Sequence, residues 1–212
     1  MQTQKIDKIF QNLAGSMPNP KTELKYKNSY TFLISVVLSA QATDKSVNTS
    51  TKKLFNIVKT PKEMIKLGEN KLKSYIKTIG LYNTKAKNII SLSKILIKKF
   101  NAKVPHSFEA LTSLPGVGNK TASVFQNEIL NIPRIAVDTH VFRVSNRTGL
   151  VKTTNPDDTQ QELERIIPKK WLKSAHHLLI LHGRYTCKSQ KPLCSKCTIL
   201  KLCNYKNKNE KN

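Results

Sequence analysis

The chain has 212 residues, of which 38% are hydrophobic, enough for one large or two small folded domains with buried cores. Lys and Arg total 37 against 13 for Asp and Glu, so the formal net charge is +24 and a polyanion is the expected partner. A membrane is excluded as that partner, because the longest apolar run, 32–38, is far shorter than the roughly 20 residues of a span. The N-terminus carries no secretory signal pattern, which indicates a cytosolic protein.

Apolar residues recur at helical spacing, and no two alternating segments are joined by a two-residue hairpin turn, so the fold class is predicted to be all-α. The first helix is expected over 5–15 and a second over 61–68, where Thr60, Pro61 and Glu63 form a capping box. Segment 32–38 is expected to be a buried element. Two more helices are predicted over 87–100 and, after Ser107 as cap, over 108–114.

The stretch LPGVGNKTAS, 114–123, interrupts the helical pattern with a tight turn before a helix over 119–130. Gly116 and Gly118 allow positive φ, so successive N–H groups can point outward together at a helix N-terminus and bind a phosphate. The alternative is a compact turn between two helices with no ligand. The high positive charge favours the phosphate site, which would contact a nucleic-acid backbone without reading its sequence.

Lys120 lies in the first turn of that helix, where the helix dipole disfavours an added cation and favours a neutral, nucleophilic amine. The competing interpretation is a simple phosphate contact. Asp138 could accept a proton from such an amine and stabilise positive charge on a sugar. Alternatively, or in addition, it caps a helix predicted over 139–148. One more helix is expected over 168–183, and the chain from Asn204 onward is expected to be disordered.

All four cysteines lie near the C-terminus with the spacing C-x6-C-x2-C-x5-C. Clustered cysteines in a cytosolic chain indicate a metal site rather than disulfides. A zinc ion with four thiolates is possible, but only one close pair is present, so the spacing favours a [4Fe-4S] cluster with one cysteine per iron. Lysines between the candidate ligands, Lys191 among them, suggest that this loop also contacts phosphate groups. The four candidate ligands are Cys187, Cys194, Cys197 and Cys203.

Four motifs, LSAQATD (38–44), LPGVGNKTA, VDTHVFRVSNRTG and HGRYTC with the cysteines behind it, together resemble the endonuclease III family over nearly the whole chain. These enzymes are bifunctional DNA glycosylases and apurinic/apyrimidinic (AP) lyases. The resemblance implies the helix-hairpin-helix glycosylase fold, with a central domain over 22–132 and a cluster domain over 1–21 plus 133–212. Duplex DNA would lie in a cleft between the two domains.

By the same resemblance, Lys120 matches the family's Schiff-base lysine, Asp138 its catalytic carboxylate, and the four cysteines its cluster ligands. Gln41 and Leu81 match residues that wedge into the duplex where the damaged nucleotide has left. The hairpin residues expected to contact DNA are Leu114, Gly116, Val117 and Gly118. Asn119 departs from the family, which often has a basic residue there.

The implied reaction is removal of oxidised pyrimidines, followed by β-elimination on the 3′ side of the abasic site. The expected partner is damaged duplex DNA, with no nucleotide cofactor and no membrane, and the expected state is a cytoplasmic monomer associated with the nucleoid. Two alternatives remain: a monofunctional adenine-type glycosylase, and a non-catalytic DNA-binding module. The adenine-type enzymes lack the lysine and carry an extra C-terminal domain, whereas a binding module would need neither Lys120 nor Asp138.

Overall fold

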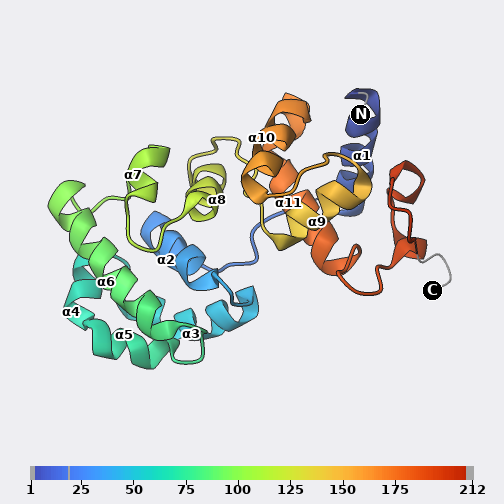
Figure 1. Cartoon of the computed structure of the whole chain (residues 1–212). Helices are drawn as coiled ribbons and strands as arrows, with labels where there is room; N and C mark the ends of the chain where they lie inside the picture. Colours follow the sequence, from blue (N-terminus) through green and yellow to red (C-terminus); the bar gives the residue numbers. More distant parts are fainter. Residues whose placement is uncertain (1–2, 19, 209–212) are drawn as a thin grey trace. The chain divides into compact units, whose positions relative to one another are not determined.

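The computed structural model describes residues 3–18 and 20–208, and the regular structure of this part of the chain is entirely helical (Figure 1). The all-α prediction is therefore confirmed. The chain divides into two compact units, one formed by Glu23–Leu130 and the other by Met1–Thr22 with Asn131–Asn212. These bounds lie one and two residues from the ones expected from the sequence. None of the described helices is both long and apolar enough to cross a membrane.

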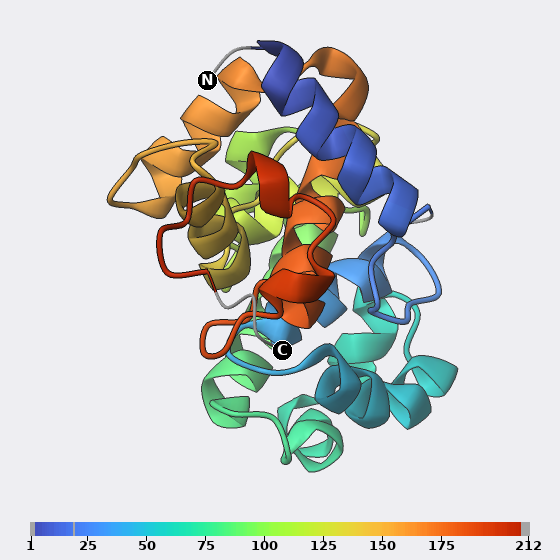
Figure 2. The same cartoon turned by 90° about the vertical axis from the view of Figure 1, so that its right-hand side faces the viewer.

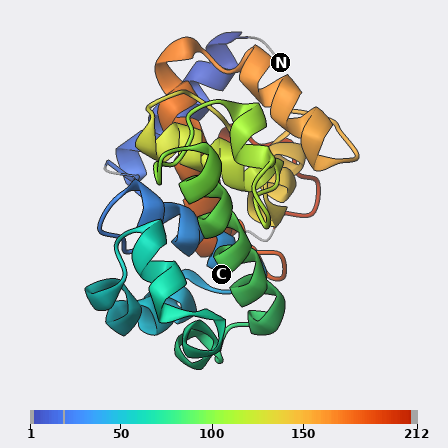
Figure 3. The ribbon, with the colours of Figure 1, turned by 90° about the vertical axis from the view of Figure 1, so that its left-hand side faces the viewer.

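The unit Glu23–Leu130 is built around α2, Ser29–Ser39, in which every residue from Tyr30 to Leu38 is buried. A helix surrounded by protein on all sides needs no polar face, which explains why this segment shows an apolar run and no stripe. The long helix α6 runs beside α4 and α5 (Figure 3). The other helices of this unit are α3 Asp44–Ile57, α4 Pro61–Leu67, α5 Glu69–Ile76, α6 Tyr82–Lys99, α7 Phe108–Thr112 and α8 Asn119–Ile129.

Helix starts in this unit follow the predicted capping residues. The Thr60 hydroxyl accepts from the backbone N–H of Glu63, and the Glu63 carboxylate accepts from the N–H of Thr60, so the capping box is confirmed. Ser107 caps α7 as predicted, accepting from the N–H of Ala110. Helix α6 begins five residues earlier than expected, at Tyr82 instead of residue 87.

The second unit pairs α1, Thr3–Ser16, with α11, Lys169–Tyr185. Trp171 of α11 is half-buried, and its indole N–H donates to Asp7 Oδ1 at 2.7 Å. Figure 2 shows α1 beside the C-terminal segment, where the Asn12 amide donates to the carbonyl of Thr198. The apolar face of α1 is buried throughout at Ile6, Ile9, Phe10 and Leu13. The remaining helices are α9 Thr139–Thr148, α10 Pro156–Ile166 and the 3-10 turns Cys194–Lys196 and Leu200–Leu202.

The prediction of disorder from Asn204 onward is wrong for the first residues of that segment. The N–H of Asn204 donates to the carbonyl of Thr148, and the Tyr205 ring lies under the guanidinium of Arg147, 4.7 Å from ring centroid to Cζ. These contacts involve a distant helix, which composition alone does not reveal. The last four residues, 209–212, lie outside the described residues.

Candidate DNA interface and active site

The glycine turn lies between α7 and α8 and uses its two glycines differently. Gly116 has φ +80°, in the left-handed region, as predicted. Gly118 has φ −92° and ψ −179°, so the prediction of positive φ there is wrong. Gly118 is the N-cap of α8 and, having no side chain, makes no side-chain cap bond to this helix. A helix start without a side-chain cap, carrying partial positive charge, is suited to an anionic oxygen.

The buried side chains of Leu114 and Val117 anchor the turn to the core of this unit. Their side chains are 2% and 4% exposed, and the N–H of Val117 donates to the carbonyl of Leu114 at 3.0 Å. Both side chains therefore belong to the core of this unit, and the amide of Val117 is engaged within the turn. The exposed part of the turn consists of Gly116, Gly118 and Asn119.

The two glycines should respond in opposite ways to alanine. A Cβ at Gly116 would lie 3.1 Å from Asn88 Nδ2 on a left-handed backbone, whereas a Cβ at Gly118 would meet nothing within 4 Å. We expect Gly116→Ala to lower the free energy of unfolding by about 1–2 kcal/mol. Gly118→Ala should leave stability nearly unchanged but weaken DNA binding, because its methyl group occupies the approach to the helix start. Urea unfolding and DNA titration of both variants check this, and equal destabilisation by the two would contradict it.

Lys120 is exposed and is the second residue of α8. The opposite side of this helix is anchored in the core by Ala122 and Phe125, both fully buried. The ring of Phe125 packs near that of Phe32 on α2, with centroids 6.2 Å apart. The helix start is therefore firmly held while the Lys120 side chain is accessible to solvent.

Asp138 is half-buried and caps α9, as predicted. Its Oδ1 accepts from the N–H groups of His140 at 2.9 Å and Val141 at 2.8 Å. Two amide donors on one carboxylate oxygen fix the orientation of the carboxylate.

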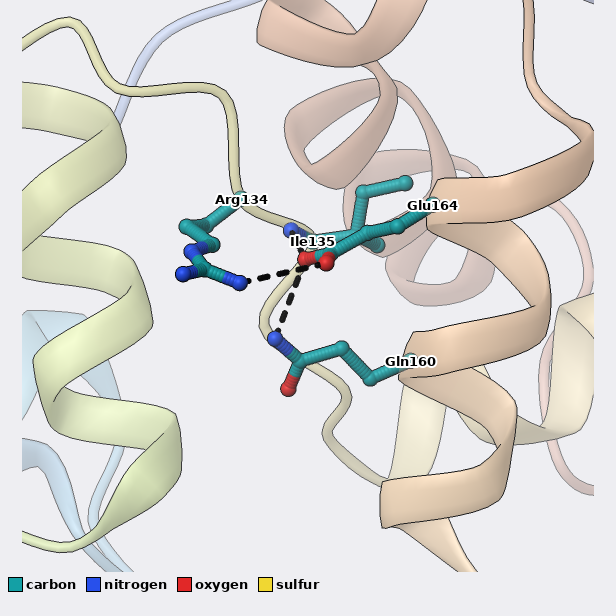
Figure 4. A network of polar contacts seen from close by, with 4 residues as sticks. All are labelled: Arg134, Ile135, Gln160 and Glu164. Carbon is teal, nitrogen blue, oxygen red and sulfur yellow. Dashed lines mark hydrogen bonds and ion pairs between the residues drawn. The ribbon is translucent and has the colours of Figure 1, made fainter. Parts of the chain in front are cut away.

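The extended segment before Asp138 is held by side chains from α10 and α11 that the sequence interpretation did not identify. Glu164 accepts from the Ile135 N–H at 3.0 Å and lies 3.4 Å from Arg134 Nη1, and Gln160 also donates to it (Figure 4). His176 Nδ1 lies 2.8 Å from the carbonyl oxygen of Ala136. These contacts hold the backbone that presents the candidate carboxylate.

Gln41 and Leu81, the predicted wedge residues, share an unusual backbone. Both are exposed non-glycine residues in the left-handed region, with φ of 54° and 58°. Gln41 follows the end of α2, and Leu81 is the N-cap of α6. A Cβ on Gly80 would lie 3.8 Å from the carbonyl oxygen of Gln41, so the two loops are neighbours. The structure thus brings these two residues onto adjacent turns of one unit.

The cysteines also come together. One cavity in the C-terminal segment is lined by side chains that include His182, Tyr205 and all four predicted ligands, Cys187, Cys194, Cys197 and Cys203. Within the described ranges, no three His, Cys, Asp or Glu side chains are placed to hold a metal ion. The four thiols therefore line one shared space.

Burial and two arginines define the surroundings of the thiols. Burial raises the pKa of the Cys197 thiol to about 11 and lowers the pKa of His182 to about 4, so the imidazole beside Cys197 is neutral. The Arg143 guanidinium donates to the carbonyls of Gly183 and Cys187, and Arg147 donates to those of Lys188 and Ser189. These bonds fix the loop after Cys187, in which Lys191 is exposed with φ 47°.

Comparison with known proteins agrees with this geometry. Residues 34–169 match the family model HhH-GPD, described as a superfamily of base excision DNA repair proteins. Endonuclease III of Rickettsia conorii is 57% identical over 205 residues, covering 97% of this chain and 98% of the relative. Endonuclease III of Escherichia coli is 48% identical over 200 residues, covering 94% and 95%.

Solved structures show the same relationship. A trapped endonuclease III–DNA covalent intermediate matches with a TM-score of 0.91 and 42% identity, covering 96% of each chain. A thermostable thymine-DNA glycosylase matches with a TM-score of 0.85 at 23% identity, which shows the shared fold alone. This chain therefore belongs to the endonuclease III family, within the HhH-GPD superfamily of base excision DNA repair proteins.

Proposed function

We propose that this protein removes oxidised pyrimidines from duplex DNA and cleaves the strand at the abasic site through a Schiff base on Lys120. Membership of the family makes the chain a base excision repair enzyme, a DNA N-glycosylase with AP lyase activity. The observation that carries the finer proposal is the likeness, over 96% of the chain, to an endonuclease III trapped as a covalent intermediate with DNA. A covalent intermediate requires a nucleophile, and Lys120 is the exposed amine on the helix behind the glycine turn.

In the proposed reaction, the damaged nucleotide first leaves the base stack, at least cost where its pairing is already weak. The amine of Lys120 then attacks the anomeric sugar carbon while the bond to the base breaks, and the base departs with the electron pair of that bond and takes up the proton that the amine loses. The Asp138 carboxylate stabilises the positive charge that develops on the sugar and accepts a proton from the amine. Its orientation by two backbone donors supports this role.

The bond between the anomeric carbon and the ring oxygen then breaks, the ring oxygen takes up the remaining amine proton, and an imine between Lys120 and the opened sugar is left. An imine acidifies the adjacent sugar carbon, so loss of that proton expels the 3′ phosphate oxygen and cuts the strand. Water then releases Lys120. All the groups in this scheme come from one chain, so the proposal requires only a monomer.

We further propose that the DNA backbone is held by the glycine turn and by Lys191, with Gln41 and Leu81 filling the gap left by the extruded nucleotide. The start of α8, which has a glycine as its N-cap, supports the contact between the glycine turn and the DNA backbone. The exposure of Gln41 and Leu81, both with a left-handed backbone, supports their entry into the gap. The net charge of +24 supplies the general attraction to phosphate.

The residues that line the cysteine cavity fit a [4Fe-4S] cluster. All four thiols line this one cavity, and their spacing, with a single close pair, favours one thiolate per iron over a zinc ion. Cys187, Cys194, Cys197 and Cys203 would each hold one iron. When bound, the cluster would supply crosslinking that stabilises the loop carrying Lys191.

Removing one thiol should remove the cluster. We expect Cys194→Ser to lose the brown colour, the visible absorption and the bound iron of the purified protein, because Cys194 is the buried ligand of the set. Lys196→Ala, at an exposed neighbour, should keep all three. Iron and zinc analysis checks this, and a colourless, zinc-containing native protein would overturn the assignment.

The proposed function is tested with two duplex oligonucleotides, one with a single thymine glycol and one with an abasic site. The native protein should release the oxidised base from the first duplex, and in each duplex it should cut the damaged strand on the 3′ side of the lesion. Base release without cleavage would favour the monofunctional glycosylase. Tight binding without either product would leave only the DNA-binding module.

A further inference from the structure

Lys85, on the first turns of α6, is a buried lysine that the proposed chemistry does not use. It is 5% exposed, and its ammonium donates to the carbonyl oxygens of Leu38 at 2.9 Å and Ala40 at 2.5 Å. Burial lowers the pKa of Lys85. Taking a charge out of water is costly unless it is hydrogen-bonded. Here the bonds go to the C-terminal end of α2, where unpaired carbonyls and the helix dipole favour a cation.

The position of this ammonium links the two turns that carry Gln41 and Leu81. Its second acceptor is the carbonyl of Ala40, the C-cap of α2 and the residue directly before Gln41. Its own backbone N–H donates to the carbonyl of Leu81 at 3.0 Å. The same residue is thus bonded through its side chain to one turn and through its backbone to the other.

Both turns need an external constraint to keep their shape. Gln41 and Leu81 each adopt a left-handed backbone that side chains disfavour, and such conformations persist where the surroundings determine them. The helix start at Leu81 has no side-chain cap of its own. Removing the ammonium would leave the carbonyls of Leu38 and Ala40 without this donor and would release the turn before Gln41.

We propose that Lys85 is a positioning residue that fixes the spacing between Gln41 and Leu81, so that the two side chains enter the duplex together. This inference rests on the proposed role of these two residues. It assigns Lys85 no contact with DNA, since the side chain is buried. The competing interpretation is that Lys85 stabilises the fold as a whole.

The experiment compares Lys85→Met with Lys87→Met. Methionine keeps an apolar stem of similar length and removes the charge. Lys87 is an exposed lysine on the same helix, so Lys87→Met is a control that removes one positive charge without affecting a buried side chain. Each variant is given the same abasic oligonucleotide as a duplex and as a single strand, and the rate of borohydride-trapped adduct is measured. In a single strand the abasic nucleotide need not be extruded from a duplex. Adduct formation there therefore requires Lys120 but not the insertion of Gln41 and Leu81.

We expect Lys85→Met to lower kcat/KM on the duplex by about tenfold to a hundredfold, as misplacement of a positioning group does, while its single-strand rate stays within about twofold. Lys87→Met should change neither. In a duplex with 2-aminopurine opposite a stable abasic analogue, Lys85→Met should also lose most of the fluorescence rise that reports unstacking. In a Gln41→Ala/Leu81→Ala background, Lys85→Met should add nothing further to the duplex defect.

Three results would overturn the inference. An equal loss on both substrates would show that Lys85 serves the fold as a whole. Native rates on both substrates would show that it has no positioning role, and an additive loss in the Gln41→Ala/Leu81→Ala background would place its effect elsewhere. If the native protein formed no adduct with the duplex and none with the single strand, the proposed function would be overturned instead. Failure of the inference about Lys85 is therefore distinguishable from failure of the proposed function.

Discussion

Replacement of Lys120 by alanine is expected to abolish strand cleavage and covalent trapping. The exposed amine at the start of α8 is the proposed nucleophile, and no imine can form without it. We expect kcat/KM for cleavage at an abasic site to fall by about 10⁴-fold or more, since what remains after loss of a nucleophile comes from binding alone. Gel-based cleavage kinetics on an abasic duplex measure this directly.

Two further variants separate the nucleophile from the charge. Lys120→Arg retains a cation for phosphate but no nucleophilic amine, so it should bind abasic DNA as tightly as the native protein and remain inactive. Lys103→Ala, at another exposed lysine of the same unit, should retain full activity. An active Lys120→Arg enzyme would show that Lys120 acts only as a phosphate contact.

Replacement of Asp138 by asparagine is expected to separate catalysis from folding. Asparagine caps helices about as well as aspartate, so the bonds to His140 and Val141 should persist and stability should change little. The variant has no charge to accept a proton or to stabilise a cationic sugar. We therefore expect base release to slow by about 10²–10³-fold, as measured by single-turnover kinetics on thymine glycol DNA.

A matched pair of cap variants isolates the structural role. Asp138→Ala should lose the cap as well, lowering the free energy of unfolding by about 1 kcal/mol. Thr60→Ala removes the confirmed cap of α4 and should destabilise by a similar amount while keeping full activity. If Asp138→Asn were as active as the native protein, Asp138 would be a helix cap only.

Local signals in the sequence predicted most of the helices, because capping residues and apolar spacing act within a few residues. Thr60, Ser107 and Asp138 all cap helices where expected. Helix α10 was missed although its start carries a readable signal: Asn155 as cap, Pro156 at the first position and two aspartates in the first turn. The buried helix α2 was predicted only as a buried element, since burial on all sides removes the periodicity that distinguishes a helix from a strand.

The candidate site was predicted only where its chemistry is local in the sequence. Cysteine spacing indicated a shared metal site, and the four thiols line one cavity. The conformation of Gly118 was predicted incorrectly, because glycine is compatible with an extended backbone as well as a left-handed one. Supports such as Lys85 and Glu164 connect segments tens of residues apart, and no short-range pattern reports such contacts.

The most direct measurement is the identity of the residue that becomes attached to DNA. The native protein is incubated with a thymine glycol duplex and borohydride, the adduct is digested with protease and nuclease, and the modified peptide is sequenced by mass spectrometry. We expect a sugar remnant on the side-chain nitrogen of Lys120. Modification at any other lysine, or no adduct from iron-loaded protein that binds the duplex tightly, would contradict it.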